Sequence, residues 1–255
     1  MPVIYDYPEY CQLLFGTRDI SAETNFLRTL IDRYSTLDVK NVLEVCCGNA
    51  LHAGELANHG YRFFGLDRNR NMLDHDISHW RHLEPKPVFI EGDMMDFTSP
   101  EPIDFAYVMI GSLYFESLDD MTRHFDAMAR AIRPGGLYFL DWCVQFSDPA
   151  SQMADKEIVR EENGIEISSR FKIRVLDVAR QFYEEVWTIS VNDHGRRRTF
   201  EMIERNKAIF PQEFLLFLES RTQFEFVGWW DQWDLSKPVD GRSDIIRPSI
   251  LIRRK

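Results

Sequence analysis

Between residues 42 and 140, short apolar runs alternate with amphipathic stretches, and this alternation constrains the fold more than any other feature of the chain. Strands that are apolar on both faces and are separated by helices indicate a parallel sheet that is covered on both sides. Right-handed crossovers between such strands give a doubly wound α/β fold. The expected strands lie at 42–45, 63–66, 88–90, 105–110 and 137–140.

Helices are expected before and between these strands, at 21–34, 50–59, 70–83 and 118–132. The last of these has the clearest signals, because Ser117 can cap its start and apolar residues recur along one face. It is expected to stop at residues 133–136, since the Pro-Gly-Gly sequence there breaks a helix.

After about residue 150 the pattern becomes a polar–apolar alternation, which predicts a small antiparallel sheet over residues 157–207. Asn163-Gly164 and Asp193-His194-Gly195 are typical of hairpin turns. A further helix opens at Pro211, and two strands at about 223–230 and 245–253 are expected to complete a seven-stranded Rossmann-like sheet.

These patterns divide the chain into four expected parts. They are an N-terminal helical lid (1–35), an α/β core (36–150), an antiparallel β subdomain that covers a substrate or a dimer partner (151–208), and a C-terminal segment that completes the core sheet (209–255).

The chain is acidic, with 30 Lys and Arg against 41 Asp and Glu and a formal net charge of −11. This charge argues against a general nucleic-acid binder, whose affinity comes from neutralising phosphates, and against docking on an anionic membrane. No apolar run approaches the ~18 residues of a membrane span, and the N-terminus lacks the pattern of a signal peptide. The four cysteines form no CxxC pair, so we expect reduced thiols and a cytoplasmic location.

The carboxyl ends of the first three strands carry the residues best suited to a ligand, because ligands of such sheets bind there. Gly48 follows the first strand, where a glycine lets a ligand approach the backbone and the next helix begins with free N–H groups. Asp67 ends the second strand, and its carboxylate can accept hydrogen bonds from both hydroxyls of a ribose. Beyond the third strand, Asp93 is placed to accept from an adenine amino group and Met94 to pack on its ring.

The sign of the charge distinguishes between two nucleoside ligands. A dinucleotide needs a glycine pattern that admits a pyrophosphate at the helix N-terminus, but Ala50 and Ala53 stand at two of the three positions. Glu44 and Asp93 would also place negative charge near the phosphates. S-adenosylmethionine has no phosphate and carries an ammonium and a sulfonium, so these carboxylates favour it over NAD.

Four motifs resemble, in order and spacing, those of the class I S-adenosylmethionine-dependent methyltransferases, over about residues 40–142. They are Leu43–Ala50, Gly65–Asp67, Glu91–Phe97 and Arg133–Gly136. Residues 9–16 and Met72-Leu73 narrow the resemblance to small-molecule N-methyltransferases typified by the amino-sugar N,N-dimethyltransferases, in which an antiparallel insert follows the fifth strand. Cys46 and Ala50 replace the outer glycines of the family's usual turn.

The resemblance implies S-adenosyl-L-methionine as cofactor and a role for each matching residue. The implied cofactor-binding set is Glu44, Cys46 and Gly48 at the methionine portion, Asp67 and Arg68 at the ribose, Asp93 and Met94 at the adenine, Met109 and Ile110 at the sulfonium, and Tyr10 from the N-terminal lid.

Methyl transfer is an in-line displacement in which the enzyme mainly aligns the reactants, so the sequence identifies no catalytic base. Ser112, Tyr114 and Trp142 follow the fourth and fifth strands and are expected to face a small-molecule acceptor. Nitrogen is the expected acceptor atom, with oxygen a close second. Two alternatives stay open: a nicotinamide-dependent oxidoreductase, and a non-catalytic module that binds a partner protein through the antiparallel sheet. The same sheet could form a homodimer, on fold analogy alone.

Several conspicuous side chains are interpreted as structural. His52 opens the helix after the glycine turn, and we expect no metal site at the histidines of residues 75–82, which face solvent. Further structural residues are Trp229, Trp230 and Trp233, expected to pack in the core sheet, and Arg196-Arg197-Arg198, expected to form a solvated edge.

Overall fold

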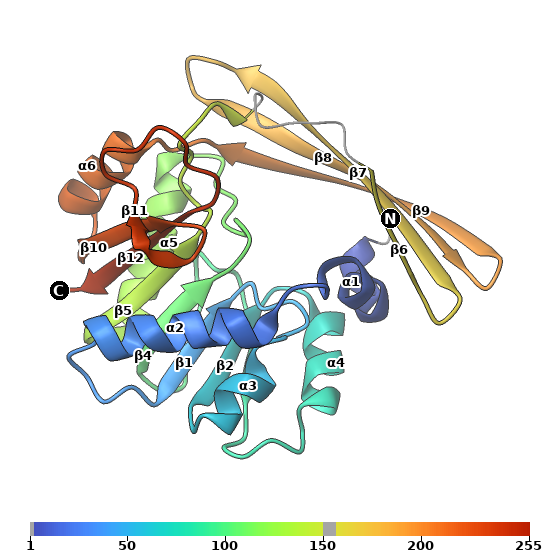
Figure 1. Ribbon diagram of the computed structural model, residues 1–255, viewed down its shortest axis with the longest axis horizontal. Coiled ribbons are helices and arrows are strands. Elements are labelled where there is room, and N and C mark those ends of the chain that lie inside the picture. Colours follow the sequence, from blue (N-terminus) through green and yellow to red (C-terminus); the bar gives the residue numbers. More distant parts are fainter. Residues whose placement is uncertain (1–2, 150–156) are drawn as a thin grey trace.

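The computed structural model describes residues 3–149 and 157–255. The expected boundary between the core and the antiparallel part, at residues 150 and 151, lies outside the described residues. Two sheets dominate the molecule (Figure 1). The larger has the strand order β11-β10-β12-β5-β4-β1-β2-β3, and the smaller has the order β6-β7-β8-β9.

The five expected strands of the core pair in parallel, as predicted. They are β1 (Asn41–Val45), β2 (Arg62–Asp67), β3 (Val88–Glu91), β4 (Ile103–Val108) and β5 (Ile132–Asp141). Alternate residues of each strand enter opposite cores. Leu43 and Val108 pack on one face with Phe125, whereas Val42 and Tyr107 pack on the other. The sheet is therefore buried on both sides, which is why its strands are continuous apolar runs.

Helices cover both faces of this sheet and its rim (Figure 1). The helical elements are η1 (Ile4–Asp6), α1 (Pro8–Phe15), α2 (Ile20–Tyr34), α3 (Ala53–Asn58), α4 (Arg70–His79), α5 (Leu118–Ala131) and α6 (Pro211–Arg221). Leu27 of α2 and Leu56 of α3 enter one core, and Phe125 of α5 and Phe214 of α6 enter the other. This arrangement is the predicted doubly wound fold.

The main sheet has eight strands rather than the predicted seven. The antiparallel strands β10 (Phe224–Asp231) and β12 (Pro248–Arg254) were expected, but β11 (Asp234–Pro238) was not. It is a short edge strand whose residues are all half-buried or exposed. A strand of this kind lacks the apolar pattern by which the others are recognised.

The start of α5 follows its sequence signal, but its end does not. The Ser117 hydroxyl accepts a hydrogen bond from the Asp120 N–H at 3.1 Å and donates to the Asp120 carboxylate at 2.8 Å. The helix ends at Ala131, and Ile132 already pairs with Ile103 as the first residue of β5. Residues 133–136 therefore belong to the strand rather than to a loop after the helix.

The smaller sheet is formed by β6 (Glu157–Glu162), β7 (Ile165–Asp177), β8 (Phe182–Asp193) and β9 (Arg196–Lys207), all antiparallel. Two of its turns are those predicted, and in each both central residues have positive φ. The angles are 52° and 78° at Asn163-Gly164, and 48° and 88° at His194-Gly195. Left-handed turns of this type match the twist of the strands that they join.

One face of the smaller sheet packs on the N-terminal segment, which lies between this sheet and the main one (Figure 1). Ile4, Cys11 and Leu14 from η1 and α1 form a third apolar cluster with side chains such as Ile189 and Phe200 of the sheet. The N-terminal segment therefore joins the two sheets. No helix in the described part of the chain is long and apolar enough to cross a membrane.

We expect Ser117→Ala to destabilise the protein by about 1 kcal/mol, because the first turn of α5 would lose its cap. Urea unfolding followed by circular dichroism measures this change. Ser220→Ala is the matched control, since the Ser220 hydroxyl bonds only within α6 to the Leu216 carbonyl, and it is expected to stay within about 0.5 kcal/mol of the parent. Equal losses in both variants would contradict the assigned cap.

Candidate active site

A tight turn follows β1 and begins the candidate site. Cys46, Gly48 and Ala50 have φ of 56°, 52° and 44°, so three alternate residues adopt a left-handed conformation. Cys46 and Ala50 keep this geometry although each has a Cβ, which costs roughly 1–2 kcal/mol per residue. The chain thus retains the shape of a glycine-rich turn with a single glycine.

Asp67, at the end of β2, is bound directly to this turn. Its carboxylate accepts from the Gly48 N–H at 2.9 Å and from the Asn69 N–H at 2.8 Å. Burial raises the pKa of Asp67, and these backbone N–H groups partly oppose the shift. Because a carboxylate has about four acceptor positions, Asp67 retains capacity for two further donors, as a ribose would supply.

A residue that follows β3, Met94, contacts the same turn through its sulfur atom. The Cys46 thiol contacts the Met94 sulfur at 3.7 Å, and the Met94 carbonyl accepts from the His124 ring at 2.9 Å. Asp93 is exposed, and its side chain accepts from the Met95 N–H at 2.8 Å. Gly48, Asp67 and Met94, predicted from separate strand ends, therefore lie together.

Glu44 lies buried beneath the turn in a chain of charged groups, with 4% of its surface exposed. One carboxylate oxygen accepts from the Tyr107 hydroxyl at 3.0 Å, and the other lies 3.3 Å from His52 Nδ1. His52 Nε2 lies 2.9 Å from Glu23, which also pairs with Arg18. Both oxygens of Glu44 thus have protein partners, so its charge would act on a ligand from below the turn.

His52 is a buried structural residue, as the sequence predicts, and it also lies between two carboxylates, which the sequence did not predict. Burial disfavours a charged ring, but the neighbouring Glu44 and the hydrogen bonds with Glu23 and Glu44 raise the pKa of His52. Burial would likewise raise the pKa of Glu23, yet the bonds from His52 and Arg18 lower it. The ring therefore bridges two carboxylates, and both contacts favour its protonated form.

The ends of β4 and β5 form the other side of the site. Met109 is buried, whereas Ile110 is 39% exposed and has a φ of 50°, a rare conformation for a β-branched residue. The Ile110 N–H donates to the buried Asp141 carboxylate at 2.7 Å, and the Ser112 hydroxyl donates to the Met109 carbonyl at 2.8 Å. Trp142 is 38% exposed with a φ of 58°. Strained backbone of this kind is concentrated at functional sites.

Tyr10 belongs to the N-terminal segment but contacts the smaller sheet. Its hydroxyl donates to Asp193 at 2.9 Å and accepts from Arg198 at 2.8 Å. The Arg198 guanidinium also lies 4.8 Å from the centre of the Tyr7 ring. The prediction that residues 196–198 form a solvated edge is therefore wrong for Arg198, although Arg196 and Arg197 are exposed.

The N-terminal segment also touches the turn region directly. The Asn49 side chain donates to the Pro8 carbonyl at 3.1 Å, and the Asn69 side chain donates to Asp6 at 3.2 Å. Two contacts connect the same region to the smaller sheet: the Tyr114 hydroxyl donates to Glu185 at 3.0 Å, and Arg68 lies 3.5 Å from Glu204.

The tryptophans of β10 and the turn after it, and the histidines of α4, make their hydrogen bonds and ring contacts with residues outside the turn after β1. Trp229 and Trp230 are buried on β10, as predicted. Trp233 lies in the turn after β10, where its ring N–H donates to Asp141 at 2.9 Å. His75 and His79 stack on each other, and among residues 3–149 and 157–255 no group of three or more His, Cys, Asp or Glu is arranged to hold a metal ion.

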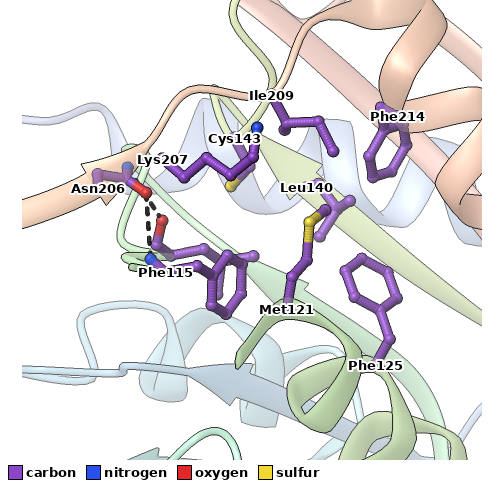
Figure 2. A pocket seen from close by; sticks show the side chains of 10 residues that line it. Phe115, Met121, Phe125, Leu140, Cys143, Asn206, Lys207, Ile209 and Phe214 are labelled. Atoms are coloured by element: carbon purple, nitrogen blue, oxygen red, sulfur yellow. Dashed lines mark hydrogen bonds between the residues drawn. The ribbon is translucent and has the colours of Figure 1, made fainter. Parts of the chain in front are cut away.

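A small enclosed cavity lies between α5, α6 and the end of β9 (Figure 2). Its volume of about 10 Å³ is close to what a single water occupies, so it is no candidate for a nucleoside. Asn206 lines it and ties two parts of the fold together, accepting from the Phe115 N–H at 3.1 Å and donating to Tyr183 at 3.1 Å.

Sequence reasoning missed the partners of the predicted residues. Tyr107 had a usable signal, because a doubly wound sheet places the fourth strand beside the first, and the register sets Tyr107 opposite Glu44. Arg18 and Glu23 had no such sequence signal, since nothing in the sequence indicates that the N-terminal segment packs against His52. Glu185 and Glu204 were likewise not recognised within the predicted antiparallel sheet.

Comparison with known proteins identifies the class of this domain. Residues 42–136 match the family described as a methyltransferase domain. This segment of the chain is therefore similar to methyltransferase domains, whose cofactor in class I enzymes is S-adenosylmethionine. The match includes the whole turn after β1 and the strand ends at Asp67 and Asp93, and it supersedes the oxidoreductase alternative.

Two curated relatives are named as methyltransferases. The cypemycin N-terminal methyltransferase of a Streptomyces species is 27% identical over 121 residues, which are 47% of this chain and 47% of the relative. The dTDP-4-amino-2,3,4,6-tetradeoxy-D-glucose N,N-dimethyltransferase of Saccharopolyspora spinosa is 28% identical over 125 residues, 49% and 48% of the two chains. The matches thus span about half the length of each relative.

A solved structure extends the likeness in fold to nearly the whole chain. The S-adenosylmethionine-dependent methyltransferase from Clostridium acetobutylicum ATCC 824 superposes with a TM-score of 0.78 and covers 96% of both chains, at 15% identity. The fold that the two proteins share therefore includes the smaller sheet as well as the core.

We expect stability to fall on acidification because of His124, which holds Met94. Burial lowers the pKa of His124 to about 4, against about 6.5 in an unfolded chain. Between these values the unfolded state binds more protons, so the contribution of His124 is complete above about pH 6.5 and is lost as the pH falls towards 4.

Urea unfolding near pH 7 and near pH 5 tests this linkage. The parent should lose roughly 1–2 kcal/mol more than His124→Gln between the two conditions. His194→Gln is the matched control, because His194 is exposed in a hairpin turn, and it should lose as much as the parent. An identical pH dependence in His124→Gln and the parent would reject the assignment.

Proposed function

We propose that this protein transfers the methyl group of S-adenosylmethionine to a nitrogen atom of a small-molecule amine. The observation that carries the proposal is the set of carboxylates around the turn after β1, with Asp67 bound to Gly48 and Glu44 beneath it. One curated relative is named as an N,N-dimethyltransferase and the other as an N-terminal methyltransferase, and these names support nitrogen over oxygen.

The charges of the site suit this cofactor better than a dinucleotide. A pyrophosphate at the turn would approach the Asp67 carboxylate, which already takes the Gly48 N–H that an anion would need. A ligand with an ammonium and a sulfonium gains from Glu44 and Asp67 instead. Gly48 presents bare backbone on the ligand side, where an added Cβ would meet only Met72 at 3.6 Å.

Each candidate residue then has a role in binding. Asp67 would accept from the ribose hydroxyls with its free lone pairs, and Cys46 with Met94 would pack on the nucleoside. Asp93, exposed beside Met94, would accept from the adenine amino group. Arg68 is the least fixed of the set, since 76% of its side chain is exposed.

The other end of the cofactor would lie over β1 and β4. Glu44 would attract the methionine ammonium through the turn, and Met109 with Ile110 would line the sulfonium end. When bound, the cofactor supplies an activated methyl carbon whose bond to sulfur breaks as the acceptor nitrogen attacks. Ser112, Tyr114 and Trp142 would align the acceptor and exclude water, which is the main contribution that this reaction needs.

The setting of the protein is also a proposal. We infer a cytoplasmic location, which the four free cysteines support, and we expect no nucleic-acid partner from the net charge of −11. A homodimer through the smaller sheet is supported by exposed apolar residues there, including Val159 and Ile203. The four-part division of the chain stays part of the same proposal, with the N-terminal segment as the lid.

We expect Asp67→Ala to weaken binding of S-adenosylmethionine and S-adenosylhomocysteine by roughly 1–3 kcal/mol, because the ribose hydrogen bonds would be lost. Isothermal titration calorimetry measures this, with NAD as a comparison ligand that should not bind. Asp74→Ala removes an exposed carboxylate of α4 paired with Arg70 and should leave affinity unchanged. An unaltered dissociation constant in Asp67→Ala would rule out the proposed ribose contact.

A further inference from the structure

Two directly opposed carboxylates lie among mainly apolar side chains on the inner face of the smaller sheet. On this face Ile189 lies opposite Phe200, and Trp187 opposite Met202. The next inward pair along β8 and β9 is Glu185 opposite Glu204. Directly opposed like charges destabilise a sheet, and burial raises the pKa of both residues. Packing alone therefore gives no reason for a glutamate pair at this point.

The protein groups around this pair leave its charge largely uncompensated. Arg68 approaches Glu204 at 3.5 Å, but 76% of the Arg68 side chain is exposed to water, which screens the pair. Glu185 accepts from the neutral hydroxyl of Tyr114 at 3.0 Å. The Tyr5 ring adds a second neutral phenol, whose pKa burial raises above its usual range.

The position of the pair relative to the core follows from its two contacts. Arg68 follows the end of β2, and Tyr114 lies in the loop after β4. Strand β1 pairs with β2 on one side and with β4 on the other. The two contacts therefore bracket the turn after β1, so the glutamate pair lies on the side of the smaller sheet that faces the proposed cofactor site.

The loop that carries Tyr114 is fixed to the same strand as Glu204. The Phe115 N–H donates to the Asn206 side chain at 3.1 Å, and the Lys207 N–H donates to the Phe115 carbonyl at 2.6 Å (Figure 2 shows the Asn206 bond). Asn206 is two residues from Glu204 and therefore lies on the same face of β9. The carboxylates and the Tyr114 hydroxyl are thus held as one unit.

We propose that Glu185 and Glu204, with the Tyr114 hydroxyl, form the subsite that binds the amino group of the methyl acceptor as an ammonium, and that one of the two carboxylates accepts an N–H proton so that the nitrogen lone pair can attack the methyl carbon. This inference rests on the proposed function, which puts the methyl donor at the turn after β1. An ammonium between the two carboxylates would relieve their repulsion and supply donors to both. An acceptor with only hydroxyl groups would leave the repulsion in place, so the pair selects amines.

Sinefungin tests the subsite without knowledge of the acceptor. This analogue of S-adenosylmethionine carries an amine-bearing carbon in place of the methylated sulfur, so it presents a cation where the methyl group would leave. S-adenosylhomocysteine has no cation at that position. The ratio of the two dissociation constants, measured by calorimetry, therefore reports the charge that faces the transferred methyl group.

We expect Glu185→Gln and Glu204→Gln each to raise the dissociation constant of sinefungin by about tenfold or more. The dissociation constant of S-adenosylhomocysteine should stay the same. Glu201→Gln is the matched control, because Glu201 lies exposed on the opposite face of β9. The thermal midpoint of Glu185→Gln should equal or exceed that of the parent, since the substitution removes a like-charge contact.

The results separate the two proposals. If both Gln variants keep the parent's ratio of dissociation constants, or lose affinity for both ligands equally, the ammonium subsite is overturned while the cofactor site stands. If the parent protein binds neither ligand, the proposed function fails, and the subsite fails with it.

Discussion

The buried carboxylate of Glu44 is the interaction on which the site depends. A carboxylate in a sheet core is costly unless it has close partners, and here it has two, the Tyr107 hydroxyl and the His52 ring. Tyr107 reaches it from β4, and His52 from the start of α3, while Glu23 of α2 extends the chain to Arg18. Satisfying one charge therefore fixes the turn above it and anchors the N-terminal segment.

The parallel sheet explains where the remaining residues gather. Because β1, β2, β3 and β4 run in the same direction, their carboxyl ends form a single rim, and Gly48, Asp67 and Met94 meet there. The N-terminal segment fills the space between this rim and the smaller sheet, held by Tyr10 against Asp193 and Arg198. The rim and the smaller sheet are thus joined through the N-terminal segment.

Sequence alone was sufficient for what depends on periodicity and on strand ends. It predicted the doubly wound core, both hairpin turns and the meeting of Gly48 with Asp67, because parallel strands bring such positions together. It could not predict β11, which has no apolar pattern, or the packing of Arg198 on Tyr7, which joins residues far apart in the chain. The opposition of Glu185 and Glu204 depends on strand register, which a pattern of alternation does not specify.

The smaller sheet is one uninterrupted stretch of chain that lies wholly outside residues 42–136, the segment matched by the methyltransferase family. The glutamate pair proposed to select the acceptor would then be encoded outside the part of the gene that encodes the donor site, whereas Ser112 and Tyr114 lie within it. If that stretch is exchanged between homologues and Asn206 is kept, so that its bond to Phe115 is preserved, the acceptor range can change while the core with the donor site stays the same.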